Sequence, residues 1–360
     1  MSAATLRSVD DLIGARLVEV AAREVLESVA SRYAIAITPE MAALIDPANP
    51  ADPIALQFVP DERELTLSQG ELVDPIGDET HSPVEGVVHR YPDRVLLKLL
   101  HVCPVYCRFC FRRETVGPGG AQSLSPQALD NAMAYIAARP QIWEVILTGG
   151  DPLALSVRRL RDVFGRLAQI EHVKIIRIHT RVPAVDPARI TDELVEMMRL
   201  CGKTVYVALH ANHPAELTPA ARAACARIID AGIPMLSQSV LLKGVNDNIE
   251  TLAALMRAFV EARIKPYYLH HADLAPGTAH LRTSVETGKE LMRALRGHVS
   301  GLCQPAYVLD IPGGHGKAPI GPDLAATEGD GRWRVEDFRG ESHEYDDPAG
   351  KATSRADRIG

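Results

Sequence analysis

The stretch HVCPVYCRFCFRR, residues 101–113, places three cysteines within eight positions. Cys103, Cys107 and Cys110 follow the spacing C-x3-C-x2-C. Three thiolates at this spacing can bind three irons of a [4Fe–4S] cluster and leave the fourth iron open to a small molecule. A zinc knuckle and a set of packed core cysteines are the alternatives. Structural zinc sites usually have four ligands in C-x2–4-C pairs, and no second pair lies nearby, so the pattern favours the cluster.

The composition is that of a globular chain. Of the 360 residues, 46% are hydrophobic and 24% charged, which allows a buried core. The formal net charge of −7 gives no reason to expect nucleic acid or an anionic membrane as a partner. No apolar signal segment opens the chain and no run approaches 18 apolar residues, so we expect no membrane span. The other three cysteines are scattered, which predicts a reducing, cytoplasmic location.

The two ends of the chain differ from its middle. Residues 1–85 contain apolar side chains at helical spacing over 10–33 and a short helical pattern at 39–44, followed by links rich in proline and acids. We interpret this segment as an N-terminal helical cap without a chemical motif of its own. Residues 323–360 form a charged, glycine-rich tail, which we expect to be flexible or loosely docked.

Between the ends, over residues 86–322, apolar runs of strand length alternate with helical stretches. The predicted strands are RVLLKLL (94–100), WEVILTGG (143–150), VKIIRIHTR (173–181), TVYVALHA (204–211), PMLSQSVLL (234–242), KPYYLHHAD (265–273) and AYVLDI (306–311). Helices are predicted after Ser125, Ser156, Asp186 and Thr218, near Asn248 and after Ser284. This alternation predicts parallel strands joined by right-handed crossovers. Six units make an α/β fold, a partial (β/α)6 TIM-like barrel, and a doubly wound open sheet is the alternative.

In such barrels the functional residues lie at the carboxyl ends of the strands. Polar side chains or glycines follow each predicted strand here, including Gly149, Gly150, Asp151, His179, Arg181, His210, Gln238, His270, Asp273 and Asp310. In ILTGGDPL (146–153) the two glycines let the backbone approach a ligand closely, although this sequence also makes an ordinary turn.

A second glycine-rich loop, DIPGGHGKAP (310–319), carries Lys317. A P-loop is excluded because its spacing needs glycine at 311 and serine or threonine at 318, where this chain has Ile311 and Ala318. Two interpretations remain. The lysine amine can form a Schiff base with pyridoxal 5′-phosphate (PLP), or the loop is a surface turn.

The cysteine motif, the GGDP turn and the DIPGGHGK loop together resemble the lysine 2,3-aminomutase family of radical S-adenosylmethionine (radical SAM) enzymes. The resemblance covers roughly residues 85–320 and includes QSVLLKGVND (238–247) and DLAPGTAHLRT (273–283). It implies a radical SAM barrel that converts L-lysine to β-lysine with a [4Fe–4S] cluster, S-adenosyl-L-methionine and PLP.

The resemblance also implies a role for individual residues. The metal ligands would be Cys103, Cys107 and Cys110, and the SAM pocket would be formed by Gly149, Gly150, Asp151, His210 and Gln238. PLP would bind to Lys317, and its phosphate would bind to Tyr91 and Arg94. The substrate would bind to Arg112, Asp273 and Asp310. Arg112 would take the α-carboxylate and the two acids the ε-ammonium. Because the glutamate-acting relatives carry other residues in place of these acids, their presence favours lysine.

Several interpretations stay open. Tyr91 and Arg94 could be a surface pair, and His210 a strand-end histidine without a ligand. The enzyme could act on another amino acid, make β-lysine for the modification of elongation factor P, or use no PLP. A non-catalytic metal-binding module is the alternative from another class. We expect an electron donor such as flavodoxin or ferredoxin as a partner, and a homodimer is a candidate assembly.

Overall fold

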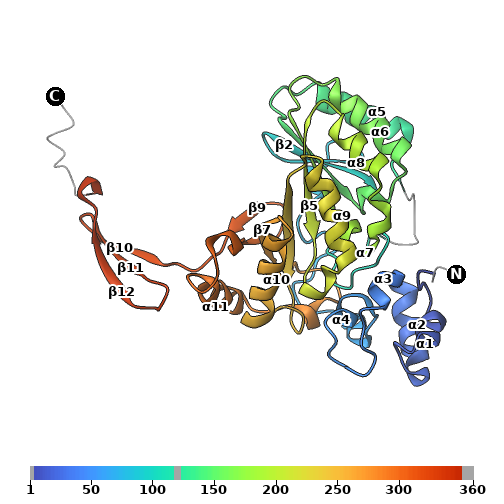
Figure 1. The fold of residues 1–360 in the computed structure, drawn as a ribbon, viewed down its shortest axis with the longest axis horizontal. Helices are drawn as coiled ribbons and strands as arrows, with labels where there is room; N and C mark the ends of the chain where they lie inside the picture. Colours follow the sequence, from blue (N-terminus) through green and yellow to red (C-terminus); the bar gives the residue numbers. More distant parts are fainter. Residues whose placement is uncertain (1–3, 117–122, 351–360) are drawn as a thin grey trace.

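The centre of the fold is a curved sheet in which seven parallel strands follow one another in sequence order (Figure 1). The computed structural model describes residues 4–116 and 123–350. The parallel strands are β2 (Arg94–Leu100), β3 (Glu144–Gly149), β4 (Ile175–Thr180), β5 (Thr204–His210), β6 (Met235–Leu241), β7 (Lys265–His271) and β8 (Ala306–Ile311). The strand order never reverses, as it would in a doubly wound sheet. The predicted partial barrel is therefore confirmed.

Burial along the strands explains why these segments form the barrel. β3 is buried at every position after Glu144, as expected for a parallel strand with helices on one face and a filled interior on the other. β6 instead alternates, and its half-buried positions Leu236, Gln238 and Val240 share one face. Gln238 is thus the one polar side chain on the half-buried face of β6.

Helices connect the strands and begin at short polar caps. The crossover helices are α5 (Pro126–Ala137), α6 (Val157–Ala168), α8 (Asp192–Arg199), α9 (Pro219–Asp230), α10 (Ile249–Glu261) and α11 (Val285–Leu295), with α7 (Val182–Val185) as an additional short turn. At five of the six predicted starts, the serine, threonine or asparagine before the helix accepts a hydrogen bond from the backbone N–H three residues later. These five starts are confirmed.

The sixth predicted start was wrong. Asp186 makes no side-chain cap and is followed only by the 3-10 turn η5 (Pro187–Arg189). The helix α8 begins only at Asp192, and its cap is Thr191, which accepts a hydrogen bond from the N–H of Leu194 at 3.2 Å. Proline at the first helical position is compatible with either type of helix, so an acid followed by proline does not by itself fix the start.

Two antiparallel strands that we did not predict extend the sheet. β1 (Val87–Tyr91) pairs with β2, and β9 (Gly316–Pro319) pairs with β8. The β8–β9 hairpin puts Lys317 directly opposite Asp310. The sheet therefore holds the loop lysine beside an acid at the end of the last parallel strand.

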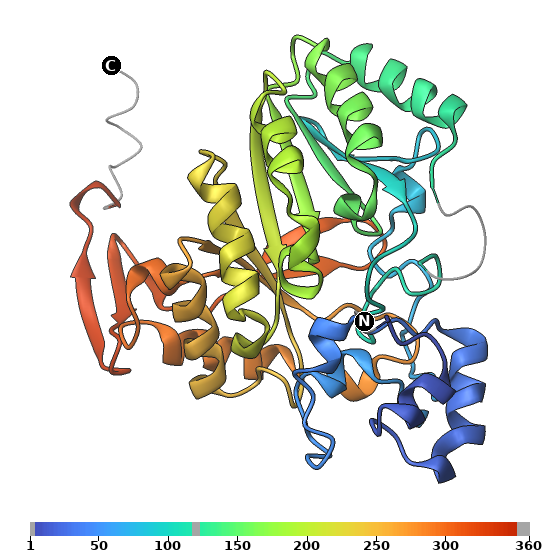
Figure 2. The same cartoon turned by 45° about the vertical axis from the view of Figure 1, so that its right-hand side comes forward.

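The N-terminal segment is helical and lies at one end of the barrel (Figures 1 and 2). It consists of α1 (Val9–Gly14), η1 (Val20–Ala22), α2 (Arg23–Arg32), α3 (Pro39–Ala42), α4 (Ala55–Phe58), η2 (Glu62–Leu65) and η3 (Glu79–His81). The first predicted helix is interrupted near Arg16, whose φ of 60° is left-handed and cannot continue a right-handed helix. Thr38 Oγ1 donates a 2.6 Å hydrogen bond to Val185 O, beyond the end of β4. The segment thus covers the carboxyl ends of the strands.

The C-terminal segment contains structure that the sequence analysis missed. Strands β10 (Ala325–Gly329), β11 (Arg332–Glu336) and β12 (Ser342–Asp346) form a separate antiparallel sheet that stands off from the barrel (Figure 1). Its outer strands are exposed at every position. Residues 351–360 of the predicted flexible tail lie outside the described residues. In the described part of the chain, every helix is too short or too polar to cross a bilayer.

Candidate active site

The cysteine loop follows β2 at the carboxyl end of the barrel, as predicted. All six cysteines are free thiols. In the described part of the chain, three or more metal-ligand atoms come within 4.8 Å of one another only at Asp337, Glu341 and His343, so at least two of the sulfurs of Cys103, Cys107 and Cys110 lie farther apart than that. Sulfurs that share one tetrahedral zinc ion would lie about 3.8 Å apart. The three thiols are therefore not gathered around the position of a single ion.

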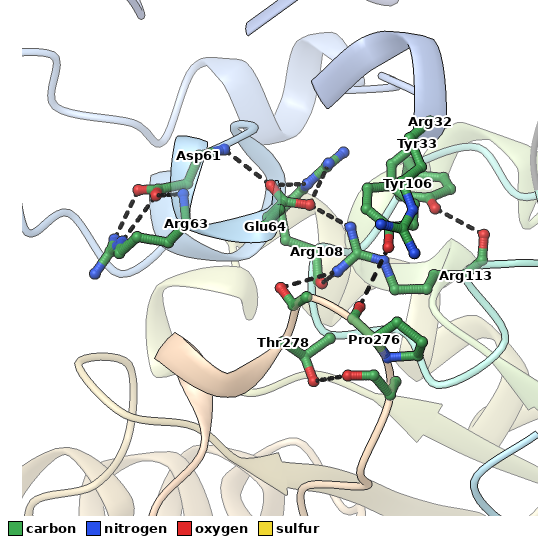
Figure 3. Close-up of polar contacts among 12 residues, drawn as sticks. Arg32, Tyr33, Asp61, Arg63, Glu64, Tyr106, Arg108, Arg113, Pro276 and Thr278 are labelled. Carbon is green, nitrogen blue, oxygen red and sulfur yellow. Dashed lines mark hydrogen bonds and ion pairs between the residues drawn. The ribbon is translucent and has the colours of Figure 1, made fainter. Parts of the chain in front are cut away.

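The loop itself is held by a buried carboxylate from the N-terminal segment (Figure 3). Glu64 accepts hydrogen bonds from Arg108 Nε at 2.9 Å and Nη2 at 2.5 Å, and it forms a second ion pair with Arg113. The side chains of all three residues are at most 1% exposed. Tyr33 stacks on Arg113, with the guanidinium carbon 3.5 Å from the ring centroid. Breaking such a desolvated group would leave charges buried without partners.

Backbone hydrogen bonds strengthen the same connection. The N–H of Tyr106 donates to Ala36 O, and the N–H of Arg108 donates to Gln57 O, both at 2.8 Å. The Tyr106 hydroxyl donates to Arg113 O within the loop at 2.9 Å. The sequence analysis gave the N-terminal segment no chemical role, whereas the structure shows that it positions the loop that carries the cysteines.

The GGDP turn packs directly against the start of the cysteine loop. A Cβ on Gly149 would lie 2.4 Å from Leu100 O, and one on Gly150 would lie 2.2 Å from Val102 O. Gly149 also has a φ of 110°, which side chains disfavour. We expected these glycines to admit a ligand. In the structure the group that approaches them is the cysteine loop, so the turn and the loop are fixed to each other.

Asp151, the third residue of this turn, joins two strand ends. Its carboxylate accepts hydrogen bonds from the Thr180 hydroxyl and the Arg181 N–H, both at 2.7 Å, and from the Leu153 N–H at 3.0 Å. Burial raises the pKa of Asp151 in spite of these donors. The side chain is therefore occupied within the protein, and its predicted contact with SAM would have to come from its backbone.

His210 and Gln238 lie opposite each other on β5 and β6. Burial lowers the pKa of His210 well below its ordinary value, so the ring is neutral. His210 Nε2 is buried and has no hydrogen-bond partner among the described residues. Gln238 Oε1 accepts a hydrogen bond from His270 Nε2 at 3.2 Å. The unpartnered nitrogen of His210 fits a pocket that is completed by a polar ligand.

The lysine loop brings together the three residues expected to bind PLP. The backbone N–H of Lys317 donates a 2.7 Å hydrogen bond to the Tyr91 hydroxyl, across the β1 edge of the sheet. The Arg94 guanidinium lies over the Tyr91 ring, 3.9 Å from its centroid. The Arg94 side chain is 34% exposed and pairs with the exposed Asp93 at 2.7 Å, so binding an anion would require it to exchange this partner. Tyr91 and Arg94 are thus neighbours of Lys317 in the fold, and the residues present fit PLP.

The lysine loop also rests on the N-terminal segment. His81 Nε2 donates to Gly314 O at 2.9 Å. A Cβ on Gly77 would lie 2.4 Å from Gly314 N, and a Cβ on Gly314 would lie 2.8 Å from His81 Nε2. Both predicted cofactor loops therefore depend on residues before position 85, which no motif indicated.

The two acids expected to bind the substrate ammonium lie in this site. Lys317 Nζ donates to Asp310 Oδ2 at 2.5 Å, and the His270 ring nitrogen Nδ1 lies 3.6 Å from the same oxygen. Burial would raise the pKa of Asp310, but the nearby His270 ring and the Lys317 ammonium hold that pKa well below its usual range. Asp310 Oδ1 is buried and accepts no hydrogen bond from the described residues. Arg90 Nη1 lies 3.9 Å from this oxygen, which leaves its hydrogen-bonding capacity available to a ligand.

Asp273 is the second acid. Burial and the nearby Asp310 carboxylate raise the pKa of Asp273 to about 7, whereas the cations of Lys317 and Arg112 oppose this rise. The charges of Asp310, Lys317 and Arg112 thus all act on the Asp273 carboxyl group. Two acids gathered near one lysine amine suit a ligand that brings a further cation.

Arg112 is paired more closely than we expected. Its Nε and Nη2 donate to Asp78 Oδ2 at 3.1 and 2.9 Å. Arg90 Nη2 and Lys98 Nζ lie 3.3 and 3.9 Å from the same carboxylate group. Three cations thus surround one acid, and the surplus of positive charge can bind an anionic group. Asp78 and Arg90 were missed because isolated charges in the sequence carry no signal of their partners.

Comparisons with known proteins show the family of this chain. The family model for the radical SAM superfamily matches residues 97–256, and the model for lysine-2,3-aminomutase matches residues 292–359. The L-lysine 2,3-aminomutase of Clostridium subterminale is 42% identical over 314 residues, which are 87% of this chain and 75% of the relative.

Two further relatives are named for different amino acids. The L-lysine 2,3-aminomutase of Escherichia coli K12 is 36% identical over 86% of this chain and 90% of the relative. The glutamate 2,3-aminomutase of Clostridioides difficile is also 36% identical, over 85% of this chain and 72% of the relative. Identity alone therefore does not separate the two amino acids as substrates.

Proposed function

This chain belongs to the lysine 2,3-aminomutase family of radical SAM enzymes, and we propose that it converts L-lysine to β-lysine. Membership of this family implies a [4Fe–4S] cluster, S-adenosyl-L-methionine and PLP. When bound, the cluster and SAM supply a hydrogen-abstracting radical, and PLP supplies a conjugated system that delocalises the unpaired spin during the 1,2-amino shift. The side chains of this protein would bind these cofactors and orient the substrate.

The cofactors would be held by the residues already described. Cys103, Cys107 and Cys110 would bind the cluster. The predicted SAM pocket is Gly149, Gly150, Asp151, His210 and Gln238. The unpartnered Nε2 of His210 supports that pocket. Lys317 would carry PLP, and Arg94 would contact its phosphate, because arginine binds phosphate with two parallel hydrogen bonds.

One observation carries the choice of lysine. Asp310 accepts a hydrogen bond from the Lys317 amine with Oδ2, its Oδ1 accepts no hydrogen bond from the described residues, and its charge raises the pKa of Asp273. A substrate ε-ammonium would fit between these two acids, whereas the side-chain carboxylate of glutamate would be repelled by them. Arg112 would bind the α-carboxylate with the surplus positive charge around Asp78. The substrate would thus be oriented at both ends, which is the main contribution that the protein can make.

An anaerobic assay tests the proposal. The protein is reconstituted with iron, sulfide and PLP, then given SAM, sodium dithionite and either L-lysine or L-glutamate. We expect β-lysine by mass spectrometry and no product from glutamate. Cleavage of SAM without turnover of lysine would contradict the substrate assignment, and retained SAM cleavage in Cys107→Ala would contradict the cluster assignment. A cytoplasmic location, a flavodoxin- or ferredoxin-like electron donor and a homodimer stay predictions.

A further inference from the structure

Arg181, at the end of β4, contacts one of the three cysteines. Its Nη1 donates a 3.1 Å hydrogen bond to the sulfur of Cys107. Within residues 4–116 and 123–350, no other side chain donates a hydrogen bond to the sulfur of Cys103, Cys107 or Cys110. The Arg181 side chain is only 6% exposed. A charged donor is thus directed at one thiol from inside the barrel.

The Arg181 guanidinium lies between two aromatic rings and is shared among three polar partners. Phe58 and Phe109 flank the guanidinium, with centroids 4.9 and 5.5 Å from its central carbon. Its Nη2 donates to Gln57 Oε1 at 3.0 Å and forms an ion pair with Glu216. Water is excluded from most of this group, so the charge is weakly screened.

Glu216 is the only acid paired with Arg181 among the described residues, and it is shared with other donors. Glu216 Oε1 accepts hydrogen bonds from the N–H groups of Asn212 and His213 at 2.8 and 2.9 Å and from Gln57 Nε2 at 3.2 Å. These donors draw part of the negative charge away from the arginine. The guanidinium therefore remains partly uncompensated where it meets Cys107.

This arrangement has a consequence for a metal cluster bound to Cys107. Reduction adds one electron and one negative charge to the cluster, and hydrogen bonds to the ligand sulfurs stabilise that added charge. Partners of the ligands tune metal sites in this way generally. We propose that Arg181 raises the reduction potential of the iron–sulfur cluster through its hydrogen bond to Cys107, and that Glu216 limits this effect. The inference rests on the proposed function, because it requires a cluster on these cysteines.

The test is an anaerobic redox titration of the reconstituted protein, followed by electron paramagnetic resonance, with sodium dithionite as the one-electron source. We expect Arg181→Gln to lower the midpoint potential by about tenfold in the reduction equilibrium, which for one electron is roughly 59 mV. Arg181→Lys should give a smaller decrease, since it keeps the charge and loses the planar fork. Glu216→Gln should shift the potential in the opposite direction, because it removes the limiting negative charge.

Arg199→Gln is the matched control, since Arg199 is an exposed arginine on α8 that pairs with Glu196. Its potential should equal that of the unaltered protein. Absence of iron and of a reducible signal in the unaltered protein would defeat the proposed function itself. A normal cluster with an unchanged midpoint in Arg181→Gln would overturn the inference. If Arg181→Gln retains no cluster, an unchanged or lowered potential in Glu216→Gln overturns it instead.

Discussion

The cysteine loop and the lysine loop are built in opposite ways. Arg108 and Arg113 of the first are almost fully buried and share the carboxylate of Glu64 (Figure 3). Lys317 of the second keeps 31% of its side chain exposed and is held by Asp310 and Tyr91. Buried charge networks are fixed when the protein folds, whereas an exposed lysine can exchange partners. The difference indicates that one loop is a rigid holder and the other is a reacting group.

Lys317→Ala tests whether the two loops are independent. We expect complete loss of aminomutase activity and of PLP absorbance, because no other lysine faces Asp310 among the described residues. Iron content and melting temperature should change little, since the buried network does not include this side chain. Lys174→Ala, an exposed lysine just before β4, is the control and should retain activity. Loss of iron in Lys317→Ala would show that the comparison is wrong.

Glu64→Gln tests the rigid holder. It keeps the size of the side chain and leaves Arg108 and Arg113 without a counter-charge. We expect a loss of about 3–5 kcal/mol in the free energy of unfolding, the usual cost of breaking a buried ion pair, together with lower iron content. Chemical denaturation and iron analysis would measure both. Glu62 is an exposed neighbour, so Glu62→Gln should leave the free energy of unfolding and the iron content unchanged. Equal stability of the two variants would contradict the role assigned to the network.

The pH dependence of substrate binding tests the acids beside the lysine loop. Asp273 has a pKa raised to about 7, so it becomes neutral as the pH falls below that value. A neutral acid cannot pair with the ε-ammonium, so KM for L-lysine should rise about tenfold per pH unit below about 7 and level off above it. Kinetics from about pH 5.5 to about pH 8.5 would measure this. Asp273→Asn should have a higher KM without this dependence, and an unchanged slope in that variant would assign the titration elsewhere.

Tyr91→Phe should have the smallest effect of these variants, a weaker binding of PLP. It deletes the hydroxyl that accepts from the Lys317 N–H and keeps the ring on which Arg94 stacks. One hydrogen bond contributes about 1 kcal/mol, so PLP should bind about fivefold more weakly in an absorbance titration. Tyr135→Phe, which loses a hydroxyl bonded to His89 outside the site, should bind PLP normally. A loss of iron in Tyr91→Phe would link the two loops more closely than we propose.

The barrel could be predicted from the sequence because its signals are local. RVLLKLL and KPYYLHHAD have the length and composition of strands, and Ser125 and Ser156 precede helices with the expected cap. β10 and β12 could not be predicted, since these exposed strands lack the apolar alternation on which such predictions rest.

The candidate site divides in the same way. The motifs identified Lys317 and the three cysteines, and the fold brings Tyr91 to Lys317 across 226 residues. The partners Glu64, Asp78 and Glu216 carried no signal, because a single acid in the sequence does not show which arginine it meets. Arg181 was visible as a polar strand end, but its contact with Cys107 depends on how β2 and β4 are placed in the barrel.

The β8–β9 hairpin gives the lysine loop an unusual kind of constraint. Asp310 pairs with Lys317 and Ile311 with Gly316, so four residues close the turn. Side chains alternate between the two faces of a strand, and a shift by one residue would turn Lys317 to the opposite face from Asp310. The spacing between these two residues therefore matters as much as their identity. Inserting or deleting one residue between Asp310 and Lys317 should therefore disrupt the site as severely as replacing either residue.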